Sequence, residues 1–141
     1  MFGFFKKKKS AKSAEDVVAN LSVDDEVLQS YQEKAAEGIA YLIDFMNDHE
    51  KDDELFQYAV KVKFEEDGNA EHMWVQVNEF SEGYFIGKLA NKPSTMKLIK
   101  YGDPVNVLKA DVEDWVLRDL LTNTKVGGFS SQYIRNVKQN R

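Results

Sequence analysis

The sequence predicts an α+β fold in which a long N-terminal helix packs on an antiparallel, strongly twisted sheet of about four to five strands. Residues 24–47 contain no proline and carry apolar side chains three or four positions apart, which is typical of an amphipathic helix. From residue 56 the apolar period changes to two, and turn residues separate the later apolar runs. A short C-terminal helix is expected to begin after Ser130 or Ser131.

The helix and the first strand each have a well-defined apolar row. The helical row is Leu28, Tyr31, Ala35, Ile39, Leu42 and Met46. The strand row is Phe56, Tyr58, Val60, Val62 and Phe64. A turn at 66–69 leads into a second strand at 72–80, followed by strands at 84–89 and 105–109. Residues 111–121 fit either a strand end or a short helix.

The chain's 141 residues fit one domain, which we expect to cover residues 14–141 after a flexible, lysine-rich tail at residues 1–13. In this tail Phe2, Phe4 and Phe5 precede Lys6 to Lys9. Such a segment suits weak anchoring at an anionic membrane. A solvated terminus is more common, so membrane contact through residues 1–9 is the less favoured expectation.

Composition and charge exclude several classes of function. The sequence contains no cysteine, which rules out disulfides and thiolate sites. The apolar residues at the start precede the lysines, the reverse of a secretory signal, so the expected location is cytoplasmic. The net charge is −5 and the acids crowd between Glu15 and Glu54, which argues against nucleic acid as a partner. No cofactor fingerprint is present, and no cofactor is expected.

Six segments in order carry a resemblance to a known family. They are Phe-Gln-Tyr-Ala-Val-Lys-Val-Lys-Phe (56–64), Glu-His-Met-Trp-Val (71–75), Phe-Ile-Gly-Lys-Leu-Ala-Asn-Lys-Pro (85–93), Gly-Asp-Pro-Val (102–105), Asp-Trp (114–115) and Val-Gly-Gly (126–128). Over residues 35–137 the chain resembles the YegJ-like bacterial family, a domain of unknown function. The resemblance implies a fold and carries over no activity, cofactor or catalytic residue.

His72, Glu71 and Asp114 are the weak candidates for catalysis. In an enzyme of unknown class, with hydrolysis as one option, His72 would act as acid or base and Glu71 or Asp114 would orient it. Adjacent residues of a strand face opposite sides, so Glu71 does not readily pair with His72. A partner from another segment would be Asp111, Glu113 or Asp114. The plainer alternative is that Glu71 and His72 bond the turn backbone or a neighbouring strand.

The candidate binding residues are Trp74, Trp115, Asn91 and Arg135. Trp74 lies opposite the Met73, Val75 and Val77 side of its strand, so a second layer of chain, a partner or a ligand must cover it. For Trp115 core packing is favoured over binding. We therefore favour a small binding or interaction module that uses the sheet face bearing Trp74, with another protein or a small ligand as its partner.

Two further segments have less specific patterns. The Gly-Gly-Phe-Ser-Ser run at 127–131, with Arg135 one turn further on, has the ingredients of an anion pocket. A glycine turn followed by a serine cap is the favoured interpretation. The acidic loop at 47–54 contains His49 but lacks the spacing of a calcium-binding loop, so no metal site is expected.

Overall fold

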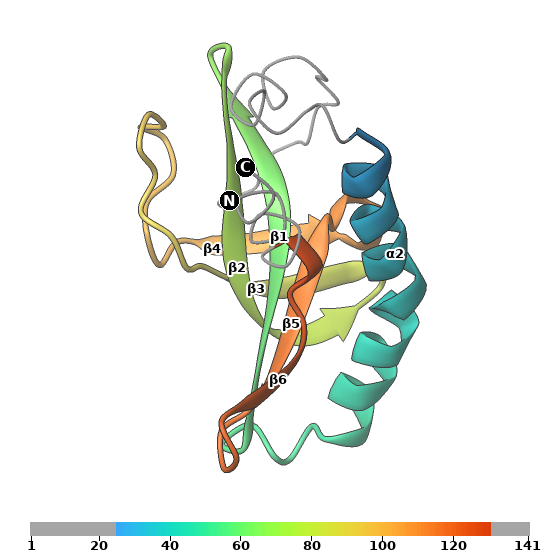
Figure 1. Cartoon of the computed structure of the whole chain (residues 1–141). Coiled ribbons are helices and arrows are strands. Elements are labelled where there is room, and N and C mark those ends of the chain that lie inside the picture. The colour runs from blue at the N-terminus through green and yellow to red at the C-terminus, as the bar shows by residue number, and fades with distance from the viewer. Residues whose placement is uncertain (1–24, 131–141) are drawn as a thin grey trace.

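The computed structural model describes residues 25–130 and confirms the α+β class (Figure 1). Within this range one long helix, α2 (Asp25–Asp48), accompanies a six-stranded antiparallel sheet. The strands are β1 (Phe56–Glu66), β2 (Asn69–Ser81), β3 (Tyr84–Leu89), β4 (Pro104–Leu108), β5 (Asp114–Asp119) and β6 (Thr124–Gly127). A 3₁₀ turn, η2 (Lys109–Asp111), joins β4 to β5. The predicted tail at 1–13 and the predicted C-terminal helix lie outside the described residues.

The strands lie in the order β4-β3-β2-β1-β5-β6, so six strands replace the predicted four to five. The extra strand is β6, which pairs with β5 between Val116↔Gly127 and Asp119↔Thr124. Sequence periodicity misses β6 because three of its four residues are exposed and no buried row alternates along it. The segment at 111–121 contains strand β5 and no α-helix.

Four of the six residues of the predicted helical stripe are buried, while the side chains of the other two, Leu28 and Tyr31, lie outside those that the structure describes. Ala35, Ile39, Leu42 and Met46 recur three or four residues apart and all belong to the core. The chain leaves the helix at His49, whose Nδ1 lies 2.8 Å from the Phe45 carbonyl oxygen. The imidazole also stacks on the Phe45 ring at 3.9 Å between centroids. His49 thus has a local role at the helix C-terminus, where the last carbonyls need donors.

One face of the sheet, here called the core face, carries the alternating apolar rows. Its buried members are Tyr58, Val60, Val62, Phe64, Met73, Val75, Val77, Phe85, Leu89, Val105, Val107, Trp115 and Leu117. The register places Val60 between Val75 of β2 and Trp115 of β5. A slip of one residue would expose the whole row, so burial fixes this pairing. Helix α2 runs along the sheet on this side (Figure 1).

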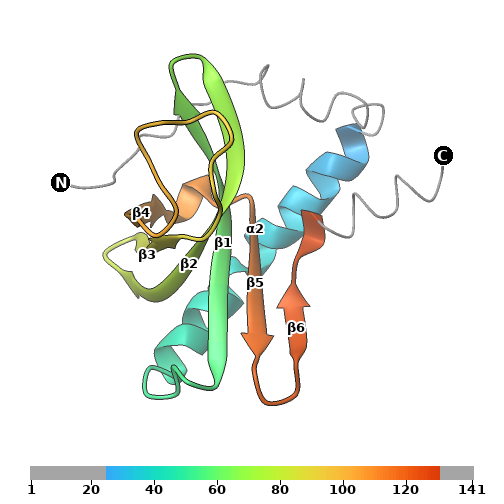
Figure 2. The same cartoon turned by 90° about the vertical axis from the view of Figure 1, so that its left-hand side faces the viewer.

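The loop between β3 and β4 covers the core face near the turn that joins β1 to β2. Glu66 and Glu71 share strand parity with Phe64 and Met73, so their carboxylates point to the core face. Both carboxylates accept hydrogen bonds from backbone amides of residues 91–103, here called the 91–103 loop. Figure 2 shows this loop beside the β1–β2 hairpin. Met96 and Ile99 of this loop are buried in the same core. The helix and this loop therefore share the covering of one twisted sheet face.

Candidate functional site

The sheet face opposite the helix, here called the outer face, brings the polar candidates together. Lys61 of β1 pairs with Trp74 of β2 on one side and with Asp114 of β5 on the other. Lys63 pairs with His72 two residues further along. Because side chains directly opposite in neighbouring strands share a face, these five residues from three strands form one continuous cluster.

His72 has a carboxylate partner, and that partner is Glu113. The distance from His72 Nδ1 to Glu113 Oε1 is 2.7 Å, with side-chain exposures of 26% and 17%. Glu113 comes from the segment just before β5, and its backbone N–H donates to the Lys61 carbonyl at 2.8 Å. This backbone bond ties the segment to β1. The arrangement is a half-buried His–Glu pair on the outer face.

Glu71 does not orient His72, because it lies on the opposite face of β2. Its carboxylate accepts the Ser94 N–H at 2.9 Å and the Thr95 N–H at 2.6 Å. The Thr95 hydroxyl donates to it at 2.8 Å. Partial burial alone would raise the pKa of Glu71, but these bonds to the ionised form hold the pKa below its ordinary value. Glu71 is an anchor for the 91–103 loop.

Asp114 does not orient His72 either. Its fully buried carboxylate accepts the Phe129 N–H at 3.1 Å, the Ser130 N–H at 2.7 Å and the Ser130 hydroxyl at 2.5 Å. The Trp115 N–H donates to it as well, at 2.8 Å. Asp114 therefore clamps the start of β5 to the chain that follows β6, and these donors account for a buried charge.

Trp74 is half-buried on the outer face, with the ammonium of Lys61 5.9 Å from its ring centroid. That distance is within the range of a cation–π contact. The Trp74 N–H donates to Asn91 Oδ1 at 2.7 Å, and the Trp74 carbonyl accepts the Ala90 N–H at 2.9 Å. The Asn91 amide thus takes the place of the next carbonyl of β3. The backbone of Trp74 is satisfied while part of its ring remains accessible.

The other two predicted binding residues differ in outcome. Trp115 is only 2% exposed and packs in the core, the placement that the sequence analysis favoured for it. Its indole N–H donates to the Ala35 carbonyl at 3.0 Å. Arg135 lies outside the described residues.

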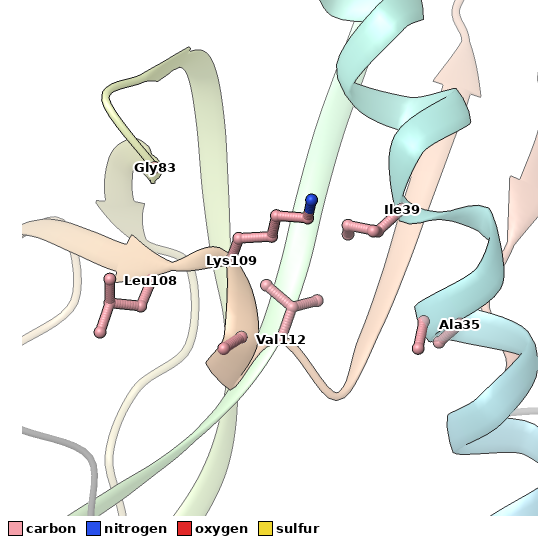
Figure 3. A pocket seen from close by; sticks show the side chains of 8 residues that line it. Ala35, Ile39, Gly83, Leu108, Lys109 and Val112 are labelled. Carbon is pink, nitrogen blue, oxygen red and sulfur yellow. The ribbon is translucent and has the colours of Figure 1, made fainter.

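A cavity of about 440 Å³, missed by sequence reasoning, lies between α2 and the β3–β4 side of the sheet (Figure 3). Its lining is mostly small or apolar: Ala35, Ala36, Ile39, Gly83, Leu108, Lys109, Ala110 and Val112. Lys109 extends from the sheet side toward Ile39 on the helix. His72 is not among the lining residues, so the His–Glu pair and this cavity are separate features.

The described part of the chain lacks two kinds of feature. Within residues 25–130, no group of three or more histidine, aspartate and glutamate side chains is arranged to hold a metal ion. No helix in the same range is long and apolar enough to cross a membrane.

Replacing Glu71 by glutamine should lower the free energy of unfolding at neutral pH by about 0.5–1.5 kcal/mol, because an amide holds the 91–103 loop less well than a carboxylate. The folded-state pKa of Glu71 is lowered from 4.5, so its stabilisation is present above pH 4.5 and is lost as pH falls through the folded value. Urea unfolding at neutral pH and at steps below pH 4.5 measures this. The variant should show a shallower acid-side decline than the wild type.

Glu79→Gln is the matched control, since Glu79 is an exposed glutamate of the same strand. It should leave both the neutral-pH stability and the acid-side slope unchanged. Equal slopes for the wild type and Glu71→Gln would contradict the anchoring role.

Comparison with known proteins places the chain in a family. Residues 24–140 match the family described as "Uncharacterized protein conserved in bacteria (DUF2314)", and the chain belongs to it. The "Uncharacterized protein YegJ" of Escherichia coli (strain K12) is 32% identical over 74 residues. That match covers 52% of this chain and 46% of the relative, about half of each. No solved structure matches. The resemblance predicted from the sequence is thereby confirmed.

Proposed function

We propose that this member of the DUF2314 family is a binding module that contacts a protein partner through the outer face around Trp74. The observation that carries the proposal is the half-buried Trp74 ring with the Lys61 ammonium beside it. Tryptophan is the residue type most enriched at binding hot spots, because it contributes a large rigid surface at low entropic cost. A ring bordered by charged groups also matches the apolar centre and polar rim of protein interfaces.

The arrangement around Trp74 supports a preformed surface. Asn91 and Ala90 satisfy the backbone of Trp74 from the β3 side, and Lys61 is fixed opposite by the β1–β2 register. The His72–Glu113 pair lies on the same face, and His72 is two residues from Trp74 along β2. A surface that is ordered before binding loses little conformational entropy when a partner arrives. The chemistry favours a partner segment with an apolar side chain for Trp74 and a carboxylate for Lys61.

Replacing Trp74 by alanine should weaken partner binding by at least about tenfold, the effect expected of a hot spot. Partners would be captured from the native host with the wild-type chain, purified, and then measured one by one by titration calorimetry. A direct titration is needed because capture alone does not locate the contact. Lys61→Glu should weaken the same complex by reversing the charge that faces the partner.

Gln57→Ala is the matched control, because Gln57 is an exposed side chain of the outer face at the far end of β1 from Lys61. It should bind as the wild type does. Thermal unfolding of each variant shows whether it is still folded, so that weaker binding can be assigned to the lost contact. The proposal is wrong if every purified partner binds Trp74→Ala as tightly as it binds the wild type.

A hydrolytic enzyme is the second candidate, favoured by the 2.7 Å contact between His72 and Glu113. A carboxylate on one ring nitrogen sets the tautomer that a general base needs. This candidate also requires a concave substrate pocket beside His72. The test is to measure hydrolysis of a panel of chromogenic esters by the wild type and by His72→Asn. Any hydrolysis that His72→Asn retains in full excludes a role of His72 in it.

A further inference from the structure

The 91–103 loop presents apolar and basic side chains outward. Leu98 is 74% exposed and Tyr101 is 63% exposed, among the largest exposures of apolar side chains in the described part of the chain. Lys92, Lys97 and Lys100 of the same loop are also exposed. Between Asn91 and Gly102 there is no acidic residue. Two large apolar side chains thus lie among three cations, in a chain whose net charge is −5.

The backbone of this loop is held in place along its length. Glu66 accepts the N–H groups of Lys97 and Leu98 at 3.0–3.1 Å, and Glu71 accepts those of Ser94 and Thr95. At the far end, the Asp103 carboxylate accepts the Lys100 N–H at 2.9 Å. These carboxylates face the loop backbone, which leaves the lysine side chains on the solvent side.

Both the ends and the interior of the loop are fixed as well. The Gly102 N–H donates to the Leu89 carbonyl at 2.8 Å, and the Leu89 N–H donates to the Asp103 carbonyl at 2.9 Å. Met96 and Ile99 enter the core and alternate with the outward residues. The backbone of the loop is held by these contacts, and Met96 and Ile99 occupy the core. Leu98 and Tyr101 are therefore held on the solvent side.

We propose that the solvent side of the 91–103 loop binds the surface of an anionic membrane. Leu98 and Tyr101 would enter the boundary between headgroups and acyl chains, and Lys92, Lys97 and Lys100 would contact lipid phosphates. Tyrosine suits this boundary because its ring is apolar and its hydroxyl is polar. Each lysine near an anionic leaflet adds attraction that falls off within a Debye length.

Shape and sequence favour a membrane over a protein partner at this loop. The loop covers the part of the core face near the β1–β2 turn, which lies away from α2 in Figure 1, so the exposed side of the loop can approach a flat, deformable surface. The sequence also contains a second segment of the same chemistry, with Phe2, Phe4 and Phe5 followed by Lys6 to Lys9. Stable attachment to a membrane commonly takes two weak signals, and the chain contains two segments of suitable composition.

The experiment is cosedimentation of the full chain with lipid vesicles. Vesicles of phosphatidylcholine mixed with phosphatidylglycerol are compared with vesicles of phosphatidylcholine alone. The wild type should bind the anionic vesicles and not the neutral ones, and added salt should weaken binding. The double variants Leu98→Ser with Tyr101→Ser, and Lys97→Gln with Lys100→Gln, should each lower the partition coefficient by at least about tenfold.

Leu121→Ser is the matched control, because Leu121 is 77% exposed at the turn between β5 and β6. It should bind anionic vesicles as the wild type does. Trp74→Ala should also retain vesicle binding, which separates this surface from the proposed protein-binding face. The proposal is overturned if the wild type does not prefer anionic vesicles, if either loop variant binds as the wild type does, or if Leu121→Ser loses as much binding.

Discussion

Replacing Trp115 by alanine should lower the free energy of unfolding by about 3–5 kcal/mol, the range for removing a large buried aromatic side chain. Trp115 is the largest of the fully buried side chains, and its indole N–H joins β5 to α2 by donating to the Ala35 carbonyl. Its ring lies close to α2 because Gly38 has no side chain, and a Cβ there would come within 2.7 Å of Trp115 Cζ2. Urea unfolding followed by far-ultraviolet circular dichroism measures the change.

Two further variants sharpen this test. Gly38→Ala should destabilise by about 1–3 kcal/mol, because the added methyl group forces the Trp115 ring or the helix to move. Tyr41→Ala changes an exposed aromatic side chain on the same helix, and it should have a smaller effect than either. A Trp115→Ala protein that unfolds at the wild-type urea concentration would contradict the central role of this side chain.

The helix and the first strand were predictable because each has a strict period and an uninterrupted apolar row. Ala35 and Ile39 mark the helical period, and Val60 and Val62 mark the strand period. The 91–103 loop is neither a helix nor a strand, so its sequence has no such period. Side-chain carboxylates accept hydrogen bonds from several of its backbone N–H groups, a role that a neighbouring strand has in a sheet. The sequence does contain one indication that another segment packs on this part of the sheet. Glu66 and Glu71 occupy strand positions with the parity of the core row, where an acid needs donors.

The outer-face cluster was only partly predictable for a related reason. Alternation shows that Trp74 and His72 share a face and that Glu71 does not. Which carboxylate reaches His72 depends on how β1 pairs with β2 and β5, and the sequence does not determine that pairing. In the structure Lys61 lies opposite Asp114, while Glu113 reaches His72. The amide of Asn91 acting as an extension of β3 has no sequence signature.

Replacing Asp114 by alanine should lower the free energy of unfolding by at least about 3 kcal/mol. The substitution leaves the Trp115 N–H, the Ser130 N–H and the Ser130 hydroxyl buried without their acceptor. Each unsatisfied buried donor costs about 1–3 kcal/mol. Asp114→Asn retains one acceptor oxygen and should have an intermediate effect. Urea unfolding at neutral pH measures both variants, with the exposed Asp53 replaced by alanine as the control.

A double-mutant cycle with Ser130→Ala tests whether the loss comes from stranded donors. In the Ser130→Ala background the hydroxyl is absent, so the further change Asp114→Ala strands one donor fewer and should destabilise less than it does in the wild type. Strictly additive effects would show that the carboxylate stabilises the fold in another way. The cycle is sensitive because the bond between Ser130 Oγ and the Asp114 carboxylate, at 2.5 Å, is the shortest contact that the clamp makes.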